Sequence, residues 1–183
     1  GRESATGRGV VEAAALMLAK QGTTLQGKRV ADCGVGEVVA RGEKGSAAVF
    51  GLPCDIVMPC ALGDAVGEAE AQTITAKLVV EGANGPLTPG ADHVLADRGV
   101  VVIPDVYANA GGVTCSYLEQ CQNFAHLTWD EDEVNARVID LMRAAFEKFY
   151  AFAQESGLPY RLAASVLGVK TIADAHRMRG LHP

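Results

Sequence analysis

The chain has 183 residues, 49% of them apolar, and a net charge of −6, which suits one well-buried domain and excludes a disordered chain. This acidic balance argues against a nucleic-acid partner, because non-specific nucleic-acid binders need a basic face. No apolar run approaches the roughly 20 residues that a membrane span requires, so we expect none.

The first two thirds of the chain alternate between helical and strand-like patterns. Residues 5–20 predict a helix with apolar residues on most sides, and Gly22 provides its stop signal. Four short apolar runs predict strands, at residues 28–33, 55–58, 77–80 and 100–103. This alternation predicts an α/β fold with a parallel, Rossmann-like sheet that is covered by helices on both faces.

Helix signals continue after the third strand. Thr88 is a candidate N-cap, Pro89 a first helical residue, and Gly99 a C-terminal stop. A capping box at residues 128–131 predicts the start of a long helix with one apolar face, which ends at Gly157. A final helix over residues 160–179 is expected to turn its apolar side chains inward, namely Leu162, Val166, Leu167, Ile172 and Ala173. Together these two helices form a C-terminal helical layer.

A glycine turn, Gly34-Val35-Gly36, directly follows the first predicted strand. Such a turn brings a dinucleotide pyrophosphate close to a helix N-terminus. However, Val39 occupies the third glycine position of the dinucleotide motif. A purely structural strand-to-helix turn is therefore the alternative interpretation.

A polar, glycine-containing segment follows the fourth strand after Pro104 and Asp105. It reads Asn109-Ala110-Gly111-Gly112-Val113-Thr114-Cys115-Ser116-Tyr117. Two glycines permit a tight turn or a close backbone approach to a ligand, and the polar side chains would line the start of a helix. The segment is a candidate binding site at the end of a buried strand.

Together with residues 5–9 and 81–86, this segment closely resembles the coenzyme domain of glutamate dehydrogenases. Residues 59–63, 107–113 and 167–169 extend the resemblance to the NAD-dependent plant and bacterial kind, within the Glu/Leu/Phe/Val dehydrogenases. The resemblance implies a Rossmann domain and oxidation of an amino acid to a 2-oxo acid by hydride transfer to NAD or NADP. It covers the chain up to about residue 32 and from about residue 54 onward.

The resemblance also implies roles for particular residues. Cofactor-binding positions are Thr6, Gly34, Gly36, Asn84 and Asn109, with Thr6 on the nicotinamide carboxamide and both asparagines at the nicotinamide end. Ser116 would contact the side-chain carboxylate of glutamate. Without the resemblance, Thr6 and Ser116 would be interpreted as ordinary N-caps, and Asn84 as part of a plain turn.

The chain departs from the family after residue 36. Residues 37–54 alone stand where the family has two further strands and helices. Since the first and fourth strands of the usual order 3-2-1-4-5-6 are neighbours, a reduced sheet of order 1-4-5-6 is expected. Glu37 replaces a coenzyme-binding asparagine, and its charge would repel a pyrophosphate, so coenzyme binding could be weakened or lost.

A second departure concerns catalysis, because the family's substrate domain supplies a catalytic lysine and an aspartate that have no counterpart here. We therefore assign no catalytic residue. Residues 1–127 would form an NAD(P)-binding Rossmann-like domain, truncated after residue 36, and residues 128–183 a helical hinge or packing segment of that domain.

Two functions are favoured at this point, ahead of a stand-alone small-molecule sensor that keeps the nicotinamide-side cleft for another ligand. One is the coenzyme-domain part of a glutamate dehydrogenase, which converts L-glutamate to 2-oxoglutarate and would be inactive as an isolated chain. The other is a non-catalytic, dehydrogenase-derived structural or regulatory subunit of a larger assembly. Protein partners or a homo-oligomer are expected in either case.

The five cysteines contain no CxxC pair, which favours reduced thiols in an intracellular protein. The cytoplasm, the mitochondrion and the plastid are all compatible with this pattern. The cysteines and the scattered histidines lack the paired spacing of a zinc site, so no metal is expected.

Overall fold

The computed structural model describes residues 2–33 and 49–180. Gly34, Gly36 and Glu37, which carry three of the sequence-based predictions, lie outside the described residues. The helices are α1 (Arg2–Lys20), α3 (Glu68–Thr73), α4 (Pro89–Asp97), α5 (Asp105–Ala108), α6 (Gly111–Ala125), α7 (Glu131–Ser156) and α8 (Tyr160–Arg179). The strands are β1 (Val30–Cys33), β2 (Ile56–Pro59), β3 (Leu78–Val80) and β4 (Val101–Ile103).

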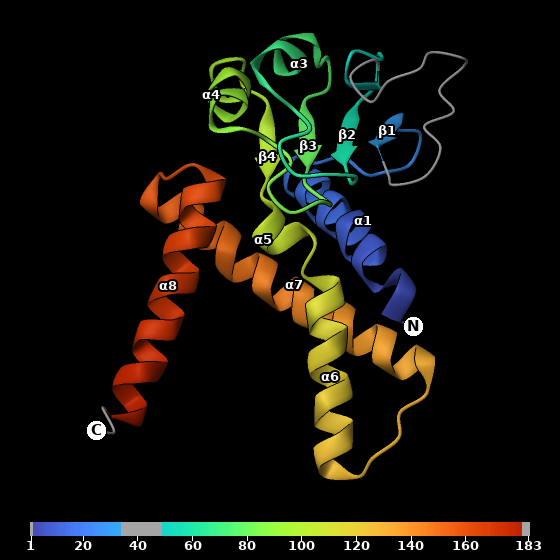
Figure 1. The fold of residues 1–183 in the computed structure, drawn as a ribbon, viewed down its shortest axis with the longest axis vertical. Coiled ribbons are helices and arrows are strands. Elements are labelled where there is room, and N and C mark those ends of the chain that lie inside the picture. Colours follow the sequence, from blue (N-terminus) through green and yellow to red (C-terminus); the bar gives the residue numbers. More distant parts are fainter. Residues whose placement is uncertain (1, 34–48, 181–183) are drawn as a thin grey trace.

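The four described strands form one parallel sheet in the order β1-β2-β3-β4 (Figure 1). The predicted reduced Rossmann-like sheet is thereby confirmed, with β1 beside the strand that corresponds to the usual fourth one. Strand bounds differ from the predicted runs by one or two residues, an ordinary uncertainty for element ends. A mixed α/β architecture with a C-terminal helical layer is the result.

Alternate residues of each strand enter cores on opposite faces of the sheet. Ile56 and Met58 join a cluster with α1, α5, α6, α7 and α8, whereas Val57 joins a second cluster with α3 and α4. Val80 and Val79 divide between the same two clusters. Side chains of a strand alternate between its faces, so the apolar runs of the sequence supply both cores at once.

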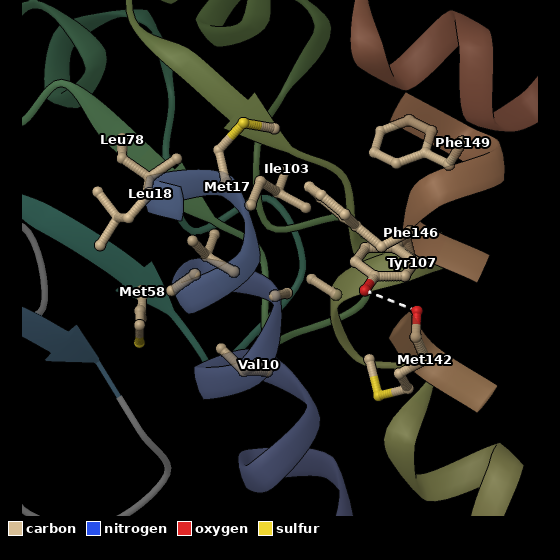
Figure 2. Packing of buried hydrophobic residues seen from close by; sticks show 14 of the residues in the cluster. Val10, Met17, Leu18, Met58, Leu78, Ile103, Tyr107, Met142, Phe146 and Phe149 are labelled. Atoms are coloured by element: carbon tan, nitrogen blue, oxygen red, sulfur yellow. Dashed lines mark hydrogen bonds between the residues drawn. The ribbon is translucent and has the colours of Figure 1, made fainter. Parts of the chain in front are cut away.

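An aromatic group stabilises the larger core on the α7 side of the sheet (Figure 2). The rings of Tyr107, Phe146 and Phe149 lie 5.6 to 6.2 Å apart between centroids. The Tyr107 hydroxyl donates a hydrogen bond of 3.1 Å to the backbone oxygen of Met142, and burial raises the pKa of this tyrosine. The group joins α5 to α7, below the end of β4.

Helices α1 and α6 cross at glycines. A β-carbon on Gly111 would overlap the backbone oxygen of Ala5 and lie 3.2 Å from the α-carbon of Gly9. Only a residue without a side chain permits this approach. The crossing brings the start of α6 against the first turns of α1, so that Gly112 lies beside Thr6.

Two predictions for the C-terminal helices are wrong. Helix α7 begins two residues later than a cap at Thr128 would place it, because Asp130 accepts a 2.8 Å bond from the Glu133 amide and Trp129 donates its own amide to Gln122. The inward orientation predicted for α8 fails for Leu162, Val166 and Ile172, which are exposed, whereas Leu167 is partly buried against the larger core and Ala173 is half-buried. Ala163 is the fully buried residue of α8, whose second half extends away from the sheet (Figure 1).

Candidate functional site

A cleft of about 640 Å³ lies beyond the carboxyl ends of β2 and β3. Ligands of open α/β sheets bind at this edge, outside the carboxyl ends of the strands. The loops after the two strands, the first turns of α1 and the start of α6 provide its walls. The lining residues are Thr6, Ala61, Leu62, Gly63, Gly82, Ala83, Asn84, Asn109, Gly112, Val113 and Ser116. All four described candidates for ligand contact, which come from three separate parts of the sequence, therefore meet in one cleft.

Thr6 and Ser116 lie inside helices and not at their ends. Thr6 belongs to α1 and Ser116 to α6, one turn beyond its start, so the N-cap interpretation is wrong for both. A β-carbon on Gly112 would overlap the Thr6 hydroxyl. Gly112 thus leaves room for that hydroxyl at the cleft.

Asn84 and Asn109 form a hydrogen-bonded pair. Nδ2 of Asn109 donates to Oδ1 of Asn84 over 2.7 Å. The amide N–H groups of Asn84 and the Oδ1 of Asn109 are then left for other partners. A donor beside an acceptor complements a carboxamide, which carries one of each.

The turn at Asn84 and Gly85 is fixed by a hydrogen bond to Asp105. Gly85 has a positive φ of 54°, which glycine adopts without strain, and its amide donates a 2.7 Å bond to Oδ2 of Asp105. Asp105 starts α5, so the end of β4 fixes the loop that follows β3. Asn84 and Asn109 are therefore positioned by the same short helix.

The start of α6 favours an anion. Its N-cap, Ala110, contributes no side-chain hydrogen bond, so the first backbone amides of the helix are not capped by a side chain at that position. These amides and the helix dipole attract negative charge, and the Ser116 hydroxyl lies one turn further along. A carboxylate fits this end of the cleft.

The described lining of the cleft is uncharged. It combines hydroxyls, side-chain amides and glycine backbone, and the sulfur of Cys60 lies where a side chain on Gly82 would be. Such a surface can bind and orient a ligand through hydrogen bonds and shape. The residues fit the carboxamide end of a nicotinamide coenzyme.

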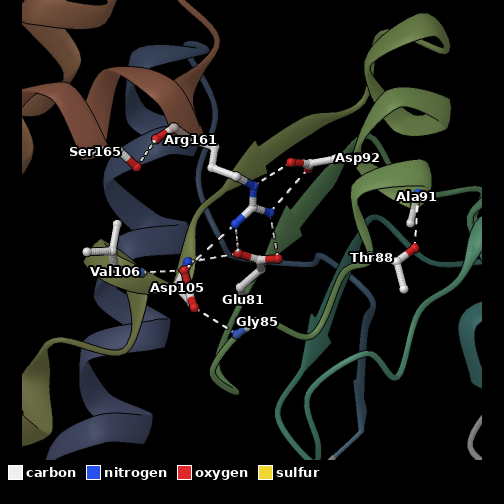
Figure 3. A network of polar contacts seen from close by, with 9 residues as sticks. All are labelled: Glu81, Gly85, Thr88, Ala91, Asp92, Asp105, Val106, Arg161 and Ser165. Atoms are coloured by element: carbon white, nitrogen blue, oxygen red, sulfur yellow. Dashed lines mark hydrogen bonds and ion pairs between the residues drawn. The ribbon is translucent and has the colours of Figure 1, made fainter.

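Charged side chains form a network next to Gly85 that the sequence patterns did not predict (Figure 3). Glu81 follows β3, is 0% exposed, and receives a two-pronged contact from Arg161 of α8 at 2.8 and 2.9 Å. Arg161 also contacts Asp92 of α4, and the Asp105 amide donates to Glu81 over 2.8 Å. One sequence signal was available, since a glutamate directly after the apolar run 78–80 would need a buried partner.

Burial and pairing act in opposite senses on these groups. Burial raises the pKa of Glu81 above that of an ordinary glutamate, although Arg161 favours the charged form. For Arg161, burial lowers the pKa, but the carboxylates of Glu81 and Asp92 outweigh this and raise it overall. The guanidinium is therefore permanently charged and holds the buried carboxylate in place.

Within residues 2–33 and 49–180, no cluster of three or more histidine, cysteine, aspartate or glutamate side chains could hold a metal ion. None of the helices described in this part of the chain is both long and apolar enough to cross a membrane.

The family comparison matches most of the chain. A family model of Glutamate/Leucine/Phenylalanine/Valine dehydrogenase matches residues 40–180. The chain belongs to this family. The resemblance drawn from the sequence motifs is thereby confirmed.

Similar members of the family are glutamate dehydrogenases. The chain is 45% identical to the NAD-specific glutamate dehydrogenase of Staphylococcus aureus (strain COL) and 42% identical to the glutamate dehydrogenase of Thermotoga maritima, each over 132 residues. Each match covers 72% of this chain but 32% of the relative. The chain thus spans about one third of the length of these relatives.

Solved dehydrogenase structures share the fold. A hetero-hexameric glutamate dehydrogenase from Thermus thermophilus in a Leu-bound form matches with a TM-score of 0.90 at 24% identity, over all of this chain and 55% of that one. The glutamate dehydrogenase of Peptoniphilus asaccharolyticus matches with a TM-score of 0.85 at 29% identity, over all of this chain and 54% of that one. The described part of the chain therefore shares the fold of these glutamate dehydrogenases.

Proposed function

We propose that the chain forms the coenzyme-domain part of a glutamate dehydrogenase, an enzyme that converts L-glutamate, water and NAD⁺ or NADP⁺ to 2-oxoglutarate, ammonia and the reduced coenzyme. The observation that carries this proposal is the meeting of Thr6, Asn84, Asn109 and Ser116 in one cleft at the carboxyl edge of the sheet. Membership of the family supports it, as does the similarity to an NAD-specific glutamate dehydrogenase. NAD is accordingly the first coenzyme to test, with NADP as the alternative.

Each side of the cleft takes a different part of the ligands in this proposal. The carboxamide of the nicotinamide is held and oriented by Thr6, Asn84 and Asn109. When the coenzyme is bound, its nicotinamide ring supplies the hydride acceptor. Ser116 and the first amides of α6 hold a carboxylate of the substrate. Gly112 and Gly82 leave room for the Thr6 hydroxyl and the Cys60 sulfur, which a β-carbon at either glycine would overlap.

Proton transfer comes, in our proposal, from groups outside these 183 residues. The described cleft lining offers hydrogen bonds but no ionisable side chain, and deprotonation of an amine needs a positioned base. The isolated chain should therefore bind coenzyme without turnover. Residues 1–127 would be the binding domain and residues 128–183 its helical hinge or packing segment.

The exposed apolar side chains of α8 favour a second candidate function. Val169 and Ile172 are 68% and 72% exposed, and such side chains are buried readily in a protein interface. A non-catalytic, dehydrogenase-derived subunit would use this helix in a larger assembly. Its partner complex would persist when the cleft is altered.

A fluorescence titration with NADH tests the first candidate. The protein should bind NADH, and Asn84→Ala should weaken binding about fivefold, the effect of losing roughly 1 kcal/mol of hydrogen bonding. Asn135→Ala is the matched control, because Asn135 belongs to α7 and does not line the cleft. Unchanged fluorescence at millimolar NADH would remove the coenzyme role.

Two further experiments, a turnover assay and the isolation of a partner complex, distinguish the two candidate functions. Glutamate added with NAD⁺ should give no NADH with the isolated chain, and measurable turnover would contradict the proposed origin of the proton-transfer groups. A stable partner complex that survives Ser116→Ala, found together with a failure to bind NADH, would instead establish the non-catalytic subunit.

A further inference from the structure

Arg161 joins the C-terminal helix to the sheet edge. It lies in the first turn of α8, 80 residues from Glu81 in sequence, and its two terminal nitrogens contact the two oxygens of that carboxylate. The same guanidinium reaches Asp92 at 3.2 Å and lies 3.8 Å from Asp105. One side chain of α8 thus contacts residues that follow β3, belong to α4 and follow β4 (Figure 3).

A continuous series of hydrogen bonds leads from this arginine to the cleft. Glu81 accepts from the amide of Asp105 over 2.8 Å, and Asp105 accepts from the amide of Gly85 over 2.7 Å. Gly85 is the neighbour of Asn84, whose side chain is bonded to Asn109 at 2.7 Å. Each link has the short separation of a good hydrogen bond, and the carboxylate links are charge-assisted.

The first carboxylate of this series cannot keep its position without Arg161. Glu81 is fully buried, and a buried carboxylate that loses its cation must bind a proton or move toward water. Either response weakens or removes the hydrogen bond that the Glu81 carboxylate accepts from the Asp105 amide. Since Asp105 also fixes the Gly85 amide, the change reaches the Asn84 turn.

We propose that Arg161 is a positioning residue for the cleft, which holds the Asn84–Asn109 pair in place through Glu81 and Asp105. The proposal rests on the proposed coenzyme role of that pair. The packing of the first turn of α8 and the affinity for coenzyme are then coupled, and because such a coupling is reciprocal, a change in either one changes the other. Any contact that shifts the first turn of α8 should therefore change coenzyme binding.

A double-mutant cycle on NADH affinity tests this coupling. Arg161→Gln should weaken NADH binding on the order of tenfold, a usual size for coupling between sites. In a protein that already carries Asn84→Ala, which alone costs about fivefold, the same substitution should cost only about a further twofold, because residues that act through each other are not additive. A merely structural role would give the same loss in both backgrounds and would overturn the proposal, as would unchanged affinity in Arg161→Gln.

The matched control is Arg143→Gln. Arg143 also belongs to the C-terminal helices and forms an ion pair of 2.6 Å with Glu12 of α1, a residue far away in sequence. It is not connected to the cleft by any of the hydrogen bonds above. Its substitution should leave NADH affinity unchanged, and a tenfold loss would show that the effect is not specific to Arg161.

Spectra of the coenzyme-free protein separate failure of this proposal from failure of the coenzyme role. Arg161→Gln should move the NMR signals of the Gly85 amide and the Asn109 side-chain amide, whether or not NADH binds. If Arg161→Gln does not fold, Arg161→Lys provides the same test, since it keeps the positive charge but cannot make the paired contacts with both oxygens of Glu81. Unmoved Asn109 signals in whichever variant folds would overturn the proposal.

Discussion

The sheet with its cleft and the helix α8 are stabilised in different ways. In the sheet region apolar side chains enter cores on both faces, and Phe146 is 0% exposed among other aromatic rings. In α8 most large apolar side chains face outward, and Ile172 is 72% exposed. The first region is held by burial over a large area, and the second at its first turn, by the ring contacts of Tyr160, the burial of Ala163 and the ionic contacts of Arg161.

This difference distinguishes the apolar burial that stabilises the domain from the few directional bonds that set the position of α8. Burial is non-directional and cumulative, so the sheet region tolerates small changes in any single polar contact. A helix held mainly at its first turn depends on a few directional bonds. The contrast therefore predicts large losses of stability from substitutions near the sheet and small ones from substitutions along α8.

The largest effect should come from Phe146→Ala. Removing a fully buried aromatic ring costs about 3–5 kcal/mol of unfolding free energy, since contacts are lost and a cavity remains. Ile172→Ala on α8 should change it by less than about 0.5 kcal/mol. Urea unfolding of both variants measures the difference, and equal losses would show that α8 is packed against a partner in solution.

The next largest change in stability is expected at two helical glycines, one near the sheet and one in α8. Gly111→Ala places a β-carbon against the Ala5 carbonyl at the α1–α6 crossing and should cost about 1–3 kcal/mol. Gly168→Ala in α8 meets nothing within 4 Å and should stabilise by about 0.5–1 kcal/mol, because alanine favours a helix. Thermal unfolding checks both signs, and a destabilised Gly168→Ala would contradict the open surroundings of α8.

The smallest effect concerns pH at the opposite edge of the sheet. The Arg29 amide donates to Asp55 over 2.8 Å and lowers the pKa of this exposed carboxyl below its value in the unfolded chain. The resulting stability is present above about pH 3.9, the ordinary value for aspartate, and is lost as the pH falls through the lower folded value. In Asp55→Asn the drop in Tm between about pH 6 and about pH 3 should be slightly smaller than in the unsubstituted protein. A steeper drop would reverse the assigned direction.

Local patterns predicted most of the fold, because their physics is local. Apolar runs identified all four described strands, and Thr88 with Pro89 correctly marked the start of α4, where Thr88 accepts from the Ala91 amide. The cap of α7 was misplaced because Gln122, on another helix, binds the Trp129 amide and leaves Asp130 as the cap. The apolar pattern of α8 showed an amphipathic helix without showing whether anything covers it.

The cleft was predictable only in part. Family motifs selected Thr6, Asn84, Asn109 and Ser116, and the structure places all four in its lining. Their roles as ligand contacts stay predictions. No local pattern pairs Glu81 with Arg161, since 80 residues separate them and only the folded chain brings them together.

An NMR titration with NADH tests the central claim most directly, because it reports where the coenzyme binds. The account predicts that the side-chain amide signals of Asn84 and Asn109 and the backbone amide of Gly112 shift together and saturate. The side-chain amide of Gln72, which belongs to α3 and does not line the cleft, should stay unchanged. Saturable shifts confined to other residues, with the three cleft signals unmoved, would contradict the assignment of this cleft to the nicotinamide.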